Sequence, residues 1–268
     1  MHRVKQDLEV EIMVEWSAAQ YSKFKGERTI PAIDLARSIE HDNVRSVLDI
    51  GCGIGNSTAV LAERFPGAKI TGADNSDDML ESARRENPDI KFIKLDAEND
   101  LGSLEDHYDV VFSNACIQWI PNHYSLLKNM FSLLNDDGIL AVQIPQQSKH
   151  PVHRIMKTVA ESDRWRDKIL VHRKYNNLNE NEYYDVLSEL TDDFRIWEIT
   201  YFHSMPSYES IIEWYNGTGL RPYLEQLNAD DQRAYCNDIL QCLKETYPMQ
   251  RNGEIIFRFP RLFFIAKK

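Results

Sequence analysis

Apolar positions along the first half of the chain follow two periods in turn. Short runs rich in β-branched and other apolar residues predict buried strands at residues 46–50, 68–74, 90–96, 108–115 and 139–145. Apolar residues at helical spacing predict helices between them, at residues 56–65, 76–87 and 123–134. Because strands and helices alternate with short connections, the pattern predicts an α/β fold with a doubly wound, mostly parallel sheet.

The pattern changes after Pro145. Residues 151–190 and 207–247 are typical of helical inserts, and residues 194–206 and 254–268 of two further strands. These strands would extend the sheet to seven, and the inserts would form a helical cap. Pro260 lies inside the final strand. It predicts a bend or bulge there, because proline lacks the N–H donor of a sheet ladder.

A glycine-rich loop follows the first expected strand, in the stretch VLDIGCGIGNST at residues 47–58. A dinucleotide-binding fingerprint would place its third glycine at position 56, which is Asn56, and a phosphate-binding P-loop would end in a lysine that is absent here. The loop therefore suits a ligand that approaches the backbone closely without being held by phosphates. A plain tight turn is the alternative.

Polar side chains follow four successive strands. Asp49, Asp74, Asp96 and Asn114 lie at or just past the strand ends, where open parallel sheets bind ligands. A carboxylate at Asp74 suits a ribose diol, one at Asp96 an exocyclic amine, and one at Asp49 a nearby cation. Ribose, adenine and a cation without a diphosphate describe S-adenosylmethionine. Alternatively, each acid is a solvated strand end, or Asp74 caps the helix that follows it.

Composition narrows the class of protein. The 268 residues carry a formal net charge of −11. This charge argues against a nucleic-acid partner, because nucleic-acid binding relies on Lys and Arg contacts to phosphates. The sequence shows no transmembrane run, no secretion signal, no metal-ligand motif such as H-E-x-x-H and no C-x-x-C pair among its four cysteines. We therefore expect a cytoplasmic protein with reduced thiols, no bound metal and no membrane contact.

Several stretches resemble one family. VLDIGCGIGNST followed by ITGADNSDDML resembles the class I S-adenosylmethionine-dependent methyltransferases. WSAAQYSKFKGERTIPAIDL, SNACIQWIPNH, LAVQIP, WYNGTGLRPYL and FPRLFFIAKK are similar, more narrowly, to the trans-aconitate 2-methyltransferases. The likeness covers residues 16–268, which implies one methyltransferase domain after an extension at residues 1–15. It also implies an antiparallel last strand.

The resemblance implies a set of cofactor contacts. The glycine loop would face the methionyl group, Asp74 would hold the ribose hydroxyls, Asp96 the adenine amine, and Asn114 would lie near the methionyl group. The full implied set is Asp49, Gly51, Cys52, Gly53, Gly55, Asp74, Asn75, Asp96, Ala97 and Asn114. The cofactor would be S-adenosyl-L-methionine, released as S-adenosyl-L-homocysteine.

Carboxylate chemistry points to arginines rather than to a catalytic base. A carboxylic acid with a pKa of about 4 is ionised at neutral pH, so methyl transfer to it needs no general base. We therefore expect no catalytic acid or base, and a small polycarboxylate substrate held by arginines through bidentate pairing. The candidates are Tyr21, Arg28, Trp119, Arg221, Tyr223, Arg258 and Arg261. Alternatively, each arginine forms a surface salt bridge and Trp119 is a core aromatic.

Two other functions stay open from the sequence. One is a carboxyl methyltransferase for another acid, such as malonyl-acyl carrier protein, whose family shares the core and a similar N-A-x-x-Q-W segment. Such a substrate calls for a basic docking face, and the acidic composition offers no obvious one. The other is a non-catalytic nucleoside-binding module, which would have a cofactor pocket without turnover.

Overall fold

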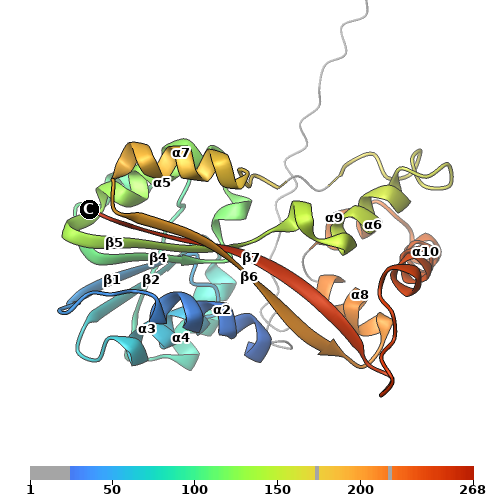
Figure 1. The fold of residues 1–268 in the computed structure, drawn as a ribbon, viewed down its shortest axis with the longest axis horizontal. Helices are drawn as coiled ribbons and strands as arrows, with labels where there is room; N and C mark the ends of the chain where they lie inside the picture. The colour runs from blue at the N-terminus through green and yellow to red at the C-terminus, as the bar shows by residue number, and fades with distance from the viewer. Residues whose placement is uncertain (1–24, 173–174, 217–218) are drawn as a thin grey trace, which may run out of the picture.

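The computed structural model describes residues 25–172, 175–216 and 219–268. Its strands form a single seven-stranded sheet in the order β3-β2-β1-β4-β5-β7-β6. β1 to β5 run parallel to one another, and β7 runs antiparallel to both β5 and β6, as expected (Figure 1). The strands are β1 (Ser46–Ile50), β2 (Lys69–Asp74), β3 (Lys91–Lys94), β4 (Tyr108–Asn114), β5 (Leu134–Pro145), β6 (Phe194–Met205) and β7 (Ile255–Lys267).

Helices cover both faces of the sheet (Figure 1). One face packs against α2 (Lys25–Arg37), α3 (Asn56–Arg64) and α4 (Asp77–Glu86). The other packs against α5 (His123–Ser132) and α7 (Glu180–Leu190). Three short 3₁₀ segments complete this part of the fold, namely η1 (Leu101–Ser103), η2 (Ile117–Trp119) and η3 (Gln147–Lys149). The predicted doubly wound α/β fold is confirmed.

A second apolar cluster lies around the far ends of β6 and β7. It is built by α6 (Pro151–Ala160), α8 (Tyr208–Asn216), α9 (Arg221–Leu224) and α10 (Ala229–Thr246). Trp165, Tyr235 and Phe257 are almost fully buried at its centre. Figure 1 shows these helices to one side of the layered sheet, with β6 and β7 reaching out to them. We refer to this group of helices as the helical cap.

The expected insert at residues 151–190 is split between two places. α6 packs in the helical cap, but α7 packs on the sheet beside α5. The reason is an apolar stripe at helical spacing: Tyr183, Val186 and Leu187 are at most 1% exposed and belong to the main core. Assigning all of 151–190 to a cap was therefore wrong for α7. The extension at residues 1–15 lies outside the described residues.

Pro260 causes no bulge. β6 and β7 pair without a register shift, with Pro260 opposite Thr200. The Pro260 carbonyl accepts from Gln146 N at 2.9 Å, just past the end of β5. The N–H and C=O of one strand residue point toward the same neighbouring strand. The position where Pro260 lacks an N–H therefore faces β5, just where its pairing with β7 ends, and the hydrogen bonds between β6 and β7 are unaffected. No helix in the described part of the chain is long and apolar enough to cross a membrane.

Candidate cofactor site

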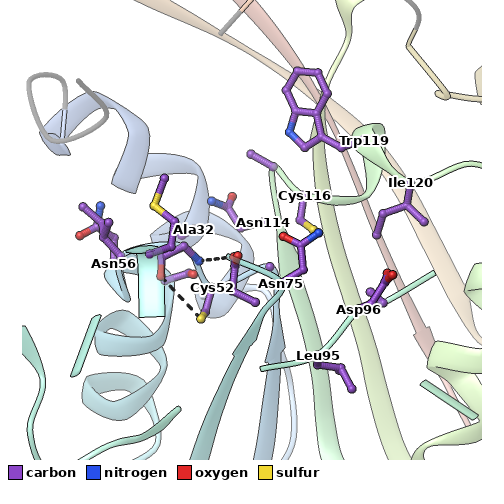
Figure 2. A pocket seen from close by; sticks show the side chains of 18 of the residues that line it. Ala32, Cys52, Asn56, Asn75, Leu95, Asp96, Asn114, Cys116, Trp119 and Ile120 are labelled. Atoms are coloured by element: carbon purple, nitrogen blue, oxygen red, sulfur yellow. Dashed lines mark hydrogen bonds between the residues drawn. The ribbon is translucent and has the colours of Figure 1, made fainter. Parts of the chain in front are cut away.

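A cavity of about 530 Å³ opens at the carboxyl ends of the parallel strands (Figure 2). Its size is ordinary for a small-molecule site. The sequence-predicted residues that line it are Gly51, Cys52, Gly53, Asp74, Asn75, Asp96, Ala97, Asn114 and Trp119. The sequence did not single out the rest of the lining, which includes Thr29, Ala32, Ile54, Asn56, Ser57, Met79, Leu95, Cys116 and Ile120.

The glycine loop brings bare backbone to the cavity wall. Gly51 and Gly53 have φ of +73° and +54°, a region that residues with a Cβ adopt at a cost. Gly51 N and Cys52 N donate to the Ala73 carbonyl at 2.8 and 3.0 Å, which fixes the loop to the end of β2. A Cβ added at Gly53 would meet no atom within 4 Å, so the backbone there is open to a ligand.

Asp74 links the loop to the next strand. Its Oδ2 accepts from Gly53 N at 2.9 Å, and its Oδ1 accepts from Ser76 N at 2.9 Å. Burial raises the pKa of Asp74 above its ordinary value, against the opposing effect of these hydrogen bonds. Each carboxylate oxygen can accept a second hydrogen bond. A ribose diol therefore fits here although both oxygens already have one partner.

Ser76, rather than Asp74, caps α4. Its side chain accepts a hydrogen bond from Met79 N. Asp77 and Asp78 occupy the first turn, where their negative charges interact favourably with the positive end of the helix dipole. The alternative role for Asp74, as the cap of this helix, is not what the structure shows.

Two predicted residues lie behind the cavity wall. Asp49 is fully buried, and its Oδ2 accepts from Ser57 Oγ and Thr58 Oγ1, both at 2.7 Å. Burial raises its pKa from 3.8 to about 6, and the two hydroxyls partly offset this. Gly55 begins α3 with φ of +88°, and a Cβ there would lie 3.3 Å from Ala83 Cβ. Both residues support the loop from below and do not line the cavity.

The third strand end provides an apolar slot with one carboxylate. Leu95, Met79 and Ile120 line it, and Ala97 is 9% exposed. The Asp96 carboxylate is held in its own turn, where Oδ1 accepts from Glu98 N and Oδ2 from Asn99 Nδ2, both at 2.9 Å. An apolar slot with a fixed acceptor at its edge suits the ring and amine of adenine.

The segment after β4 forms the opposite wall. The Asn114 Oδ1 atom is buried and has no hydrogen-bond partner among the described residues. A buried amide oxygen without a partner costs about 1–3 kcal/mol, which a bound donor would recover. Asn114 and Ala32 of α2 both line the cavity, and Figure 2 shows Trp119 beyond Cys116, on the side away from Cys52.

Burial keeps the cavity thiols protonated. It raises the pKa of Cys52 and of Cys116 well above the ordinary thiol value, and the charges of Asp49 and Asp74 add to this. All four cysteines of the chain are free. The two thiols therefore present neutral, polarisable walls rather than nucleophiles.

The predicted substrate residues are placed apart from one another. Trp119 lines the cavity, whereas Arg221 Nε binds Glu225 Oε1 at 2.6 Å and Tyr223 stacks on Tyr235 inside the helical cap. Arg258 is exposed and its guanidinium lies over the Phe202 ring. Arg261 is buried on β7. Tyr21 lies outside the described residues, as does the side chain of Arg28 on α2.

The missed wall residues had weak sequence signals. Met79 lies in the apolar stripe of α4, so periodicity alone assigns it to the core. Asn56 was noticed only as a departure from the dinucleotide fingerprint, yet its Oδ1 is buried without a hydrogen-bond partner among the described residues. Cys116 comes two residues after Asn114, and this closeness was the available signal.

Comparison with known proteins shows the family of the chain. A methyltransferase domain family model matches residues 41–191. Trans-aconitate 2-methyltransferases from Shigella flexneri serotype 5b and Escherichia coli O157:H7 are 41% identical over 256 residues, which is 96% of this chain and 99% of each relative.

Two solved structures share the fold. The YcgJ protein of Bacillus subtilis aligns with a TM-score of 0.58 at 15% identity, over 89% of this chain and 98% of that one. A Haemonchus contortus phosphoethanolamine N-methyltransferase, in complex with phosphomonomethylethanolamine and S-adenosylhomocysteine, aligns with a TM-score of 0.54 at 18% identity. That match covers 91% of this chain and 52% of the other. The chain therefore belongs to the S-adenosylmethionine-dependent methyltransferases, in the family of the trans-aconitate 2-methyltransferases.

Proposed function

We propose that this protein transfers a methyl group to a carboxylate of trans-aconitate and so forms a methyl ester. The observation that carries the proposal is 41% identity to trans-aconitate 2-methyltransferases over nearly the whole length of both chains. The fold and the cavity at the strand ends agree with it. The substrate is thus a free small molecule, and we place the reaction in the cytoplasm.

Cofactor binding is assigned to the cavity walls. In this proposal, Asp74 accepts hydrogen bonds from the ribose hydroxyls and Asp96 accepts one from the adenine amine. The backbone of Gly51 and Gly53 lies along the methionyl chain. The support is the placement of these residues around one cavity of adequate size. Asp49 acts indirectly, since its hydrogen bonds hold Ser57 and Thr58 at the start of α3 beneath the loop.

The residues of the chain act by alignment. When bound, S-adenosylmethionine supplies a methyl group on a positively charged sulfur. The substrate carboxylate is already ionised at neutral pH, so no residue has to remove a proton from it. The protonated thiols of Cys52 and Cys116 and the buried face of α2 instead exclude water from the reacting groups.

A substrate panel tests the proposal. The purified full chain would be incubated with methyl-labelled S-adenosylmethionine and trans-aconitate, other di- and tricarboxylates, or malonyl-acyl carrier protein. Methyl ester on trans-aconitate is the expected product. If only malonyl-acyl carrier protein were methylated, the protein would instead be a carboxyl methyltransferase for the carrier-bound acid. Cofactor binding without any product would leave only a nucleoside-binding module.

A further inference from the structure

A polar row crosses three neighbouring strands beside the cofactor cavity. Asn114 on β4 is paired with Gln143 on β5, and Gln143 is paired with Phe263 on β7. Arg261 precedes Phe263 by two residues, so it lies on the same face of the sheet. α2 covers this face: Ala32, which lines the cavity, belongs to the same apolar cluster as Phe263. The row therefore starts at the cavity wall and ends at a cation.

Burial makes the unsatisfied donor of this row costly as a purely structural feature. Gln143 is fully buried and Arg261 is 5% exposed. Arg261 Nη1 donates to Gln143 Oε1 at 3.4 Å, which is a long hydrogen bond, and the guanidinium lies 4.3 Å from the centre of the Phe259 ring. The Gln143 Nε2 atom is buried and has no hydrogen-bond partner among the described residues. Leaving such a donor unsatisfied costs about 1–3 kcal/mol.

Charges are unequally distributed around the site. The cofactor end of the cavity carries Asp74, Asp96 and Glu98, which suit a cationic ligand. At the other end of the row, Arg261 adds a positive charge, and His150 is near enough for that charge to contribute to the lowering of its pKa. Burial is the largest cause of that lowering, followed by the charge of His153, so His150 is neutral at neutral pH. A cation would thus be favoured in the cavity, and an anion at the Arg261 end of the polar row.

We propose that Gln143 Nε2 and the Arg261 guanidinium bind one carboxylate of a di- or tricarboxylate substrate. This inference rests on the proposed function, because it assigns that function's anionic substrate to a defined place beside Asn114. The bound carboxylate is one that is not methylated, since pairing with a guanidinium withdraws charge from a nucleophile. Gln143 was not among the candidates from sequence, although a glutamine within the apolar strand ILAVQIP was a visible signal.

Three variants test this subsite. Gln143→Glu places a carboxylate beside Arg261, where it competes with the substrate carboxylate for the guanidinium and repels it. Arg261→Lys keeps the charge and loses the fork geometry. Arg258→Lys is the matched control, because Arg258 lies on the same strand but is exposed over Phe202. Calorimetry would measure binding of trans-aconitate and of citrate to each protein saturated with S-adenosylhomocysteine, and steady-state kinetics would give KM and kcat.

The expected result is a selective loss of anion binding. Gln143→Glu should weaken trans-aconitate binding by about 100-fold, and Arg261→Lys by about 10-fold, as for disrupted buried charge pairs. Both should raise KM far more than they lower kcat. Neither should change the affinity for S-adenosylhomocysteine, and Arg258→Lys should match the wild type. If Arg261→Lys does not fold, Gln143→Leu provides the second measurement, with a smaller loss expected.

The outcomes separate this inference from the proposed function. If the wild type makes the methyl ester and the Gln143 and Arg261 variants keep its KM, the subsite is overturned. An equal rise of KM in Arg258→Lys would overturn it as well. If the wild type makes no ester but binds trans-aconitate or citrate, and Gln143→Glu abolishes that binding, the subsite stands and the proposed function falls.

Discussion

The Asp74 carboxylate holds the glycine loop at the same time as it faces the cavity, because its Oδ2 accepts from Gly53 N at 2.9 Å. One side chain at the end of β2 thus sets the position of the backbone after β1. The geometry links two roles that the sequence suggested separately, a ribose acceptor and a close-approach loop. Removal of this carboxylate should therefore weaken cofactor binding more than removal of an exposed acidic side chain nearby.

Asp74→Ala should weaken S-adenosylhomocysteine binding by about 2–3 kcal/mol, which is the scale for a hydrogen bond to a charged acceptor plus a displaced loop. Asp74→Asn should lose less, since the amide oxygen can still accept from Gly53 N. Calorimetric titration measures both. Asp78→Ala is the control, because Asp78 is exposed in the first turn of α4. Equal affinities for the wild type and Asp74→Ala would remove Asp74 from the site.

Gly51 should tolerate no side chain while Cys116 is present. A Cβ at Gly51 would lie 2.1 Å from Cys116 Sγ and 2.3 Å from its Cβ, and φ is +73°. Gly51→Ala should therefore destabilise the protein by about 2–4 kcal/mol through overpacking and backbone strain. Chemical unfolding of the single and double variants measures this. Adding Cys116→Gly should restore at least about 1 kcal/mol, since contacting residues couple.

Gly53→Ala provides the comparison for that loop. Gly53 also has a positive φ, but its added Cβ would meet nothing within 4 Å. Its unfolding free energy should fall by only about 1 kcal/mol, from strain alone. If Gly53→Ala proved as destabilising as Gly51→Ala, contact with Cys116 would not be the cause.

The strand and helix alternation was predictable because it depends on local patterns. Buried parallel strands are short apolar runs, and each helix between them shows one apolar stripe. The place of α7 was not predictable in the same way: its stripe of Tyr183, Val186 and Leu187 is equally suited to a cap or to the sheet, and the choice depends on tertiary packing. The first residue of β5 was missed for a related reason. Asp137 lies within β5 but has φ of +63°, and the sequence around it is typical of a turn, so the sequence predicts a strand that begins only after it.

The residues of the cavity wall were largely predictable from the sequence, whereas Gln143 and the difference between the candidate arginines were not. Strand ends are fixed by the fold, so Asp74, Asp96 and Asn114 converge without further information. Which arginine faces the interior depends on β7 register and on burial. Arg258 and Arg261 are three residues apart on one strand and differ completely in exposure. Strand alternation places them on opposite faces but does not say which face is buried, so both were candidates from the sequence.

Tyr183→Phe should destabilise the fold although it changes one atom. His123 Nε2 donates to the Ile117 carbonyl at 2.8 Å, so its Nδ1 accepts from Tyr183 Oη at 2.6 Å. Removal of the hydroxyl leaves that buried nitrogen without its donor, at a cost of about 1–3 kcal/mol. Urea unfolding measures the change. Tyr184→Phe, at an exposed neighbour on α7, should stay within about 0.5 kcal/mol of the wild type.

The same contact gives His123 a structural role. The side chain of Asn122 caps α5 by accepting from Ser125 N, and His123 is the buried first residue of that helix. Burial lowers its pKa, which agrees with the neutral ring that the two hydrogen bonds require. If Tyr183→Phe cost no more than Tyr184→Phe, this tautomer assignment would be wrong.

Asp49 should make stability depend on pH between about 4 and 6. Burial raises its pKa from 3.8 to about 6 in the folded protein, so over this range the folded state binds more protons than the unfolded state. Unfolding free energy must then fall as pH rises, and the full penalty applies above pH 6. At about 1.4 kcal/mol per pKa unit, the penalty is about 3 kcal/mol.

Asp49→Asn removes this titration while its amide oxygen can still accept from Ser57 and Thr58. The difference in unfolding free energy between Asp49→Asn and the wild type should therefore shift by about 2 kcal/mol in favour of the variant from pH 4 to pH 7. Asp109→Asn is the control. Burial opposes ionisation of Asp109, but hydrogen bonds from Arg45, Asn135 and Ser46 outweigh it and hold its pKa below the ordinary value. The stabilisation by ionised Asp109 is lost only as pH falls below about 4. The difference in unfolding free energy between Asp109→Asn and the wild type should therefore be constant between pH 5 and 7. A constant difference for Asp49→Asn as well would mean that Asp49 titrates as an ordinary carboxylate, and the buried support beneath the glycine loop would have to be reassigned.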